Sequence, residues 1–464
     1  MKILFIRCNE NLIKINSETN ITGIYPPLAI AYISGYIKKY ADNTDISFLD
    51  AHLNKMNEKK TSSFFNKNKF DVYFLQAYSL SWHSVLKTAE IIKIHNKNAF
   101  LVVGGPQITA YPYESMANGL FNIGIIGEGE EISYKIIKLF NTPELYSIPG
   151  TIININGKIT MNPNHKLTDD INLLPFPDFD LINNNYFSLT VRKPFATMIT
   201  SRGCCYNCAF CSQIYGGNKI RYRNSENIAD EIEIYIKKYK VKEIIFFDET
   251  FTFDKNRVID ICNEIIKRNL KFIFNIRTRV DKIDEEILIK LKEAGCSTVH
   301  IGIESASEKT LSNMKKGITL NDIKTAVALC KKHSILVRGY FIIGYPGESK
   351  EDILNTINFS KKLDLDFASF TIAVPNPKTL LYDIAISEKY INYDYWKEFS
   401  LGMEKNQVPY FCNQIITKDF LEKFLKKAYF SFYCRLNFIL KQLFFIKLYI
   451  VRNIFTLLYY KIIK

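Results

Sequence analysis

Short apolar runs alternate with longer amphipathic segments along the first 148 residues of the chain. The apolar runs have the length of buried strands, and the segments between them repeat apolar positions at helical spacing. Strands are predicted at 3–6, 46–49, 72–76, 100–103 and 123–126, and helices at 28–40, 81–95 and from residue 130. This rhythm predicts an α/β domain over residues 1–148 with a doubly wound, Rossmann-like sheet, whose ligands lie beyond the carboxyl ends of the strands.

The alternation restarts with longer units in residues 194–381. Strands are predicted at 196–200, 243–247, 272–276, 298–303, 337–343 and 367–372. Six such units suit a partial (β/α)6 TIM-type barrel with its chemistry at the strand carboxyl ends. The pattern in residues 149–193 predicts a hairpin around Asn156-Gly157, followed by a proline-rich linker. A basic, aromatic, helical region is predicted for residues 382–464.

The distribution of charge and the cysteine content indicate which partners and which cellular compartment to expect. Much of the net charge of +14 lies between Lys418 and Lys464, where ten basic residues face two acidic ones among many Phe, Leu and Ile. This mixture favours a lipid surface or an apolar partner over nucleic acid. No apolar run in this tail reaches the length of about 18 residues that a membrane-spanning helix needs. The tail is therefore expected to pack on the core or on a partner, with peripheral membrane contact as the alternative. Ten cysteines without a disulfide-like framework, and no signal peptide, predict a cytoplasmic protein.

Two glycine turns follow consecutive strands of the first domain. Gly104 and Gly105 end one strand, and Gly127, Glu128 and Gly129 end the next. Glycine in such turns lets a bulky ligand approach the backbone closely, although ordinary turn chemistry explains either turn alone.

Three cysteines, Cys204, Cys208 and Cys211, are separated by three and two residues in one short stretch. Thiolate sulfur is a soft ligand that suits zinc or an iron–sulfur cluster. A closed zinc site needs four ligands, and no second ligand pair follows downstream, so one metal position is expected to stay open. Recruitment of Cys205 to zinc, or simple burial of the thiols, remains the alternative.

The cysteine spacing, Phe210 before the last cysteine and the Ser-Arg-Gly lead-in resemble the radical S-adenosylmethionine superfamily. The resemblance implies that the three cysteines bind a 4Fe-4S cluster whose open iron chelates S-adenosylmethionine. An electron from the cluster, delivered by a reductase such as flavodoxin or ferredoxin, would then cleave the C–S bond to a deoxyadenosyl radical.

Polar residues at the ends of later barrel strands extend the resemblance. Asp248 and Glu249 end the second strand, and alone they could be a general acid and base or a solvated strand end. In the superfamily this position accepts hydrogen bonds from the adenosylmethionine ammonium, most directly through Glu249. The resemblance also assigns adenosylmethionine contacts further along the barrel, at Arg279, Glu304, Ser305, Ile342 and Gly344. Surface salt bridging is the alternative for the arginine.

The first domain resembles the cobalamin-binding domain that precedes the radical core in one large subgroup. A Pro-Pro-Leu-Ala-Ile helix start, Asp50-Ala51, and the two glycine turns in this order carry the likeness, which implies that the turns contact cobalamin. Gln107 stands where a His often follows Gly-Gly-Pro, and the Asp-x-His-x-x-Gly signature is absent. We therefore expect no protein imidazole on cobalt, and expect His52, His83 and His95 to be surface or packing residues.

These resemblances imply a cobalamin-dependent radical S-adenosylmethionine enzyme. The favoured activity is methyl transfer to an unactivated carbon of a small hydrophobic metabolite. An oxidative cyclase or rearrangement enzyme with the same cofactors, or a corrin-binding regulator without turnover, remains an alternative. A methylthiotransferase is disfavoured because its first domain carries a second cysteine triad, whereas this one has only Cys8.

Overall fold

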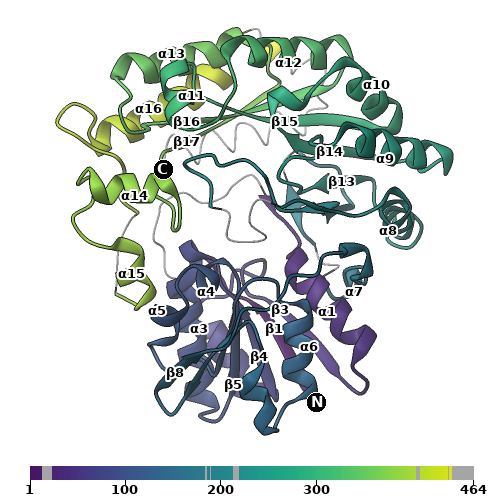
Figure 1. The fold of residues 1–464 in the computed structure, drawn as a ribbon, viewed down its shortest axis with the longest axis vertical. Coiled ribbons are helices and arrows are strands. Elements are labelled where there is room, and N and C mark those ends of the chain that lie inside the picture. Colours follow the sequence, from purple (N-terminus) through teal and green to yellow (C-terminus); the bar gives the residue numbers. More distant parts are fainter. Residues whose placement is uncertain are drawn as a thin grey trace.

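The computed structural model describes residues 1–12, 23–182, 185–188, 190–212, 219–403, 408–436 and 438–440. Two mainly parallel sheets, each flanked by helices, form two domains that face each other across the middle of the molecule (Figure 1). The predicted fold class, a doubly wound domain followed by a partial barrel and a helical region, is confirmed.

Seven strands form the first sheet, in the order β3-β1-β4-β5-β6-β7-β8. The first five are parallel, and the last two run antiparallel to their neighbours. The strands are β1 (Lys2–Arg7), β3 (Asp45–Asp50), β4 (Val72–Gln76), β5 (Phe100–Gly104), β6 (Ile123–Ile125), β7 (Thr151–Ile155) and β8 (Lys158–Met161). Because the chain passes from β3 back over β1 to β4, the topological switch point lies between β1 and β4, where ligands of such sheets bind.

Helices cover both faces of this sheet. Alternate strand residues enter two separate apolar cores, one under α1 and α6 and the other under α3. The helices are α1 (Leu28–Tyr40), α2 (Glu58–Lys67), α3 (Trp82–His95), α4 (Pro106–Ala110), α5 (Pro112–Met116) and α6 (Glu130–Lys138).

The sequence placed the β7–β8 hairpin in the segment between the two domains. In the structure, the hairpin instead extends the first sheet. It pairs antiparallel with β6, with Gly124 opposite Ile152. A β-carbon on Gly124 would lie 2.7 Å from the Ile152 side chain, so the glycine permits this close pairing. The connection to the barrel then contains α7 (Phe179–Ile182) and the short strands β2 (Gly23–Ile24) and β9 (Phe187–Ser188), which pair with each other.

Six parallel strands form the second sheet in sequence order. They are β10 (Phe195–Met198), β13 (Glu243–Phe246), β14 (Ile273–Thr278), β15 (Cys296–Glu304), β16 (Leu336–Ile343) and β17 (Phe367–Ile372). One face packs on the helices to form the largest core. These helices are α8 (Ser225–Lys237), α9 (Lys255–Lys267), α10 (Glu285–Ala294), α11 (Glu308–Asn313), α12 (Leu320–Lys332) and α13 (Lys350–Lys362). Capping boxes at Thr319 and Ser349 fix the starts of α12 and α13.

The helix α16 (Lys418–Tyr433) covers the outer edge of β17. The Tyr433 hydroxyl donates to the Ala368 carbonyl at 2.7 Å and accepts from its amide at 3.1 Å, and Tyr429 makes the same pair of bonds with Phe370 at 3.1 and 3.2 Å. An unpaired edge strand would otherwise expose a row of backbone groups. Two tyrosines therefore take the place of a seventh strand.

The helices α14 (Leu380–Ser387) and α15 (Tyr395–Ser400) run along one side of the molecule and join the barrel to the first domain (Figure 1). Trp396 and Trp82 are fully buried in the same core there. Among residues 1–440, as far as the structure describes them, no helix combines the length and apolar character needed to cross a membrane. The last 24 residues, 441–464, on which part of the predicted membrane contact rests, lie outside the described residues.

Candidate functional site

The three predicted cluster ligands lie on the loop that follows β11 (Ser201–Arg202), a short strand paired with β12 (Arg221–Tyr222). Cys204 and Cys208 are partly exposed, Cys211 is exposed, and all three are free thiols. The Ala209 amide bonds to the Met314 carbonyl at 2.9 Å, and its carbonyl accepts from the Leu381 amide at 2.8 Å. The loop is thus fastened between the barrel and α14, with its thiols toward solvent-accessible space.

The thiols are neighbours but do not converge on one point. Although Cys211 as a whole residue is exposed, the protein atoms packed around its sulfur, together with the neighbouring Cys208 and Cys204, raise the pKa of its thiol to about 11. Within the described ranges, no three His, Cys, Asp or Glu side chains are grouped as ligands of one metal ion. Three separate sulfurs at the edge of a loop have the chemistry that a multi-iron cluster needs from its protein ligands.

Two cations face this loop. Arg279 lies over the Tyr206 ring at 3.8 Å, and its guanidinium approaches the Cys208 sulfur at 3.9 Å. Its other nitrogens donate to Asp281 at 2.8 Å and to the Lys316 carbonyl at 2.5 Å. Burial raises the pKa of Cys208, while the charges of Lys316 and Arg279 act against that rise. The structure therefore brings Arg279, predicted as an adenosylmethionine contact, to the cysteine loop itself.

The two carboxylates after β13 have different surroundings. Asp248 is fully buried and accepts hydrogen bonds from the Thr200 amide and hydroxyl and from the Ser201 hydroxyl, so it holds the lead-in to the cysteine loop. Glu249 instead lines a cavity between the two domains. Burial raises the pKa of Glu249 to about 7. Of this predicted pair, Glu249 is placed to meet a ligand cation.

Glu304 and Ser305 form an ion pair and a hydrogen bond with other side chains of the barrel. Glu304 has a left-handed backbone, φ 65°, and forms a buried ion pair with Lys316 at 2.7 Å. The Ser305 hydroxyl donates to Glu348 at 3.2 Å. Glu348 also accepts from the backbone amides of Gly344 and Tyr345, at 2.8 and 3.0 Å. Sequence reasoning assigned no role to Glu348.

The last two predicted adenosylmethionine contacts lie at the end of β16. Ile342 is partly buried against the interdomain core. Gly344 has φ 75°, and a β-carbon there would lie 2.6 Å from Leu421 of α16. The glycine is thus needed for the close approach of α16, whatever else it contacts.

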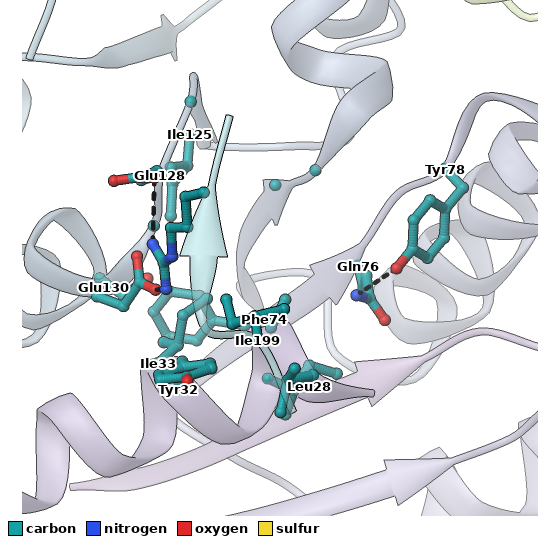
Figure 2. A pocket seen from close by; sticks show the side chains of 18 of the residues that line it. Leu28, Tyr32, Ile33, Phe74, Gln76, Tyr78, Ile125, Glu128, Glu130 and Ile199 are labelled. Carbon is teal, nitrogen blue, oxygen red and sulfur yellow. Dashed lines mark hydrogen bonds and ion pairs between the residues drawn. The ribbon is translucent and has the colours of Figure 1, made fainter. Parts of the chain in front are cut away.

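A cavity of about 440 Å³ opens between the two domains (Figure 2). All five residues of the predicted glycine turns line it: Gly104, Gly105, Gly127, Glu128 and Gly129. The barrel side contributes Ile199, Ser201, Arg202, Gly203, Phe247 and Glu249. The cavity therefore joins the carboxyl ends of the first sheet to the residues beside the cysteine loop.

The cavity walls suit a broad ligand with an apolar body. Leu28, Ile33, Phe74, Ile125 and Ile199 surround it (Figure 2). A β-carbon on Gly127 would meet no atom within 4 Å, so this turn leaves room for a ligand next to the backbone. Gln76 donates to the Tyr78 hydroxyl at 3.2 Å, while its buried carbonyl oxygen has no hydrogen-bond partner. An orphaned acceptor here suits a ligand that brings its own donors, as the amide-rich rim of cobalamin does.

Glu128 and Glu130 tie the domains together across this cavity. Arg202, which precedes the cysteine loop, pairs with Glu128 at 3.2 Å and with Glu130 at 2.6 Å (Figure 2). Arg221 of β12 also pairs with Glu128, at 2.5 Å. The first domain is thus bonded directly to the strand pair that carries the cysteine loop.

Among the described residues that line the cavity there is no histidine. His83 is buried and stacks on Phe399 of α15 at 4.1 Å. Gln107 is also buried and points away from the cavity, donating to Ser115 at 3.1 Å and to Ser400 of α15 at 2.6 Å. The position after Gly-Gly-Pro thus docks α15 on the first domain, and His83 packs as expected.

Two family models match the chain. Residues 198–360 match the radical SAM superfamily, and residues 19–137 match the B12 binding domain. These ranges cover most of the partial barrel, without its last strand β17, and most of the first domain. The cavity and the cysteine loop therefore lie where the two matched regions meet.

Similar proteins agree with both matches. An uncharacterized methyltransferase from Pyrococcus horikoshii is 33% identical over 422 residues, 90% of each chain. An anaerobic magnesium-protoporphyrin IX monomethyl ester cyclase from Rubrivivax gelatinosus is 28% identical over 391 residues, 82% of this chain and 69% of that one. The structure of the radical S-adenosylmethionine methyltransferase TsrM from Kitasatospora setae, with cobalamin and a [4Fe-4S] cluster bound, covers 84% of this chain and 78% of its own. Its TM-score is 0.66 at 18% identity, so that likeness concerns the fold.

Proposed function

The chain belongs to the cobalamin-dependent part of the radical S-adenosylmethionine superfamily, and on that premise we propose that it transfers a methyl group to an unactivated carbon of a small molecule. The observation that supports this most is a cavity that both domains line, with the glycine turns at one side and Glu249 and Gly203 at the other. Methyl transfer between cofactors of the two domains needs such a shared space.

The cofactors are a 4Fe-4S cluster, S-adenosylmethionine and cobalamin. When bound, they supply a one-electron reductant, a radical precursor and a methyl carrier. We assign the cluster to Cys204, Cys208 and Cys211, whose loop is fixed by Ala209 and whose lead-in is held by Asp248. Arg279 and Lys316 would stabilise the negative charge of the thiolates there.

Glu249 would bind the ammonium group of adenosylmethionine. A carboxylate with a pKa near 7 is stabilised in its charged form once a cation lies beside it. On the cobalamin side, the glycine turns give backbone contact and leave room beside Gly127, and the described part of the cavity lining contains no histidine. We therefore propose that no imidazole of this chain binds cobalt.

A second candidate is an oxidative cyclase with the same cofactors. The 28% identity to the Rubrivivax gelatinosus cyclase over 82% of this chain favours it specifically. The two activities share every residue assigned above and differ only in what happens to the substrate radical. A transferred methyl group in the product would therefore distinguish them.

Anaerobic reconstitution tests the proposal. We expect the reconstituted protein with dithionite to release deoxyadenosine from adenosylmethionine, and Cys208→Ala to release none. Cys205→Ala is the matched control, because Cys205 lies in the same loop but outside the ligand spacing. Bound cobalamin without any adenosylmethionine cleavage would contradict an enzyme and favour a corrin-binding regulator.

Three further parts of the account are proposals. The electron would come from a flavodoxin- or ferredoxin-type reductase, since a small-molecule substrate and a reductant are what this superfamily uses. The substrate would have a hydrophobic body, in keeping with the apolar cavity. A cytoplasmic location with peripheral membrane contact through the C-terminal tail stays a prediction.

A further inference from the structure

Three basic side chains form a row on the inner face of the barrel. In the strand register, Arg277 of β14 pairs with His300 of β15, and His300 pairs with Arg338 of β16. Their neighbours along the strands, such as Ile276, Val299 and Val337, are fully buried toward the helices. The three basic side chains point the other way and remain partly exposed. They therefore meet on one accessible surface inside the barrel.

The two arginines have no carboxylate partner in the described part of the chain. Arg277 lies over the Phe247 ring at 4.2 Å and Arg338 over the Phe367 ring at 5.1 Å. The Nε atom of each is buried without a hydrogen-bond acceptor. Three buried arginines, Arg221, Arg223 and Arg279, each pair with a carboxylate, namely Glu128, Glu231 and Asp281. Arg257 resembles the row in having a buried Nε without an acceptor, but it donates to the Thr200 carbonyl at 2.7 Å. Sequestering a guanidinium from water without an anion is unfavourable.

His300 does not neutralise the positive charges of Arg277 and Arg338. Burial, Arg338 and Arg277 lower the pKa of His300 well below its usual value, so its ring is neutral. One ring nitrogen, Nδ1, lies 2.9 Å from the hydroxyl of Tyr340, the next inward-facing residue of β16. Burial also lowers the pKa of Arg277, and Arg338 adds to that effect, while the phenols of Tyr340 and Tyr25 and the carboxylate of Glu249 act against it. The row itself thus presents two guanidiniums, a neutral imidazole and a phenol, and Glu249 acts on Arg277 through its charge without an ion pair between them.

We propose that this row binds an oxyanion group, a carboxylate or a phosphate, at one end of the substrate. This inference rests on the proposed function, because it assigns the substrate class of the same site. Arg277 stacks on Phe247, and Phe247 and Glu249 line the interdomain cavity. A substrate whose acidic group is held by Arg277 and Arg338 would extend its apolar part toward that cavity. Guanidinium groups bind carboxylate and phosphate groups through paired hydrogen bonds.

Inorganic phosphate and acetate are the probes, each added to the reconstituted protein at constant ionic strength with chloride as the reference. We expect a saturable rise in Tm, and the anion that produces it at the lower concentration identifies phosphate or carboxylate as the group. Arg277→Gln and Arg338→Gln should each weaken this response by about tenfold. Arg268→Gln is the matched control, since Arg268 lies outside the barrel and pairs with Asp230 and Glu264.

The Tm without added anion separates binding from packing. Because removal of an unpaired charge relieves repulsion, we expect Arg277→Gln and Arg338→Gln to keep or raise the Tm measured in chloride. A lower Tm than that of Arg268→Gln, or a phosphate and acetate response equal to that of the wild type, would overturn the inference. Failure of the wild type to release deoxyadenosine would instead contradict the proposed function, and the anion response would still be measurable.

Discussion

Glu128 gives a sharp test of how the domains are joined. Its carboxylate is largely buried, with 12% of the side chain exposed, and it pairs with Arg202 and Arg221. In Glu128→Gln, Arg221 keeps its bond to the Thr168 carbonyl but loses its anion, and Arg202 keeps only Glu130. Leaving a buried charge without its partner costs about 3 to 5 kcal/mol, and the retained amide oxygen reduces this to about 2 to 4 kcal/mol.

The assay is thermal unfolding of the protein without added cobalamin. Because the unfolding entropy of a 464-residue chain is about 1 kcal/mol per degree, the loss corresponds to a Tm lower by about 2 to 4 °C. Glu131→Gln, in the first turn of α6, is the matched control, because Glu131 is 35% exposed in its pairs with Lys135 and His165 and should change stability by less than about 0.5 kcal/mol. Equal Tm values for Glu128→Gln and Glu131→Gln would refute the interdomain ion pairs as a source of stability.

The pH dependence of this contribution has a definite sign. Burial alone would raise the pKa of Glu128, but the hydrogen bond and charge of Arg221 with the charge of Arg202 outweigh it and hold the pKa below its usual value. The stabilisation is therefore present above the ordinary glutamate pKa of about 4.3 and is lost as the pH falls below it. The Tm difference between wild type and Glu128→Gln should shrink in acid, and a constant difference would contradict this cause.

Two further predictions concern the barrel. Tyr433→Phe leaves the amide and carbonyl of Ala368 without partners, so urea denaturation should show a loss of about 1 to 3 kcal/mol, and an unchanged midpoint would contradict the edge-covering role of α16. Burial raises the pKa of Glu348 to about 7, so the folded state retains a proton that the unfolded state releases, and stability should fall as the pH rises from about 4.3 to 7. Glu348→Gln should lessen this fall by about 1 to 3 kcal/mol, measured by urea denaturation at pH 5 and pH 8, and an equal fall in both proteins would contradict the assignment.

The sequence predicted the architecture well because its signals are local. Each strand and helix of the two domains shows its own periodic pattern of apolar residues. The three cysteines likewise lie within a single short motif. The glycine turns were located for the same reason, since strand ends at one sheet edge meet in space. All five turn residues indeed line one cavity.

The roles of individual side chains were harder to predict because they depend on distant partners. Asp248 resembles Glu249 in sequence, yet only the fold shows that Thr200 and Ser201 occupy its oxygens. Glu128 meets Arg221, which lies 93 residues away. Gln107 faces α15 because a helix from the end of the chain packs there. The two-residue alternation of β-strands is enough to place Arg277 and Arg338 on one face of the sheet. That neither arginine has an acidic partner depends on tertiary contacts, which the sequence pattern does not show.

The most direct test of the central claim is Mössbauer spectroscopy of the anaerobically reconstituted, iron-57-labelled protein with and without S-adenosylmethionine. The account predicts one 4Fe-4S cluster bound by Cys204, Cys208 and Cys211, with one iron whose signal changes when adenosylmethionine is added. It also predicts the same spectrum for Cys205→Ala. A protein that binds zinc, or a cluster with four protein ligands whose signal ignores adenosylmethionine, would contradict it.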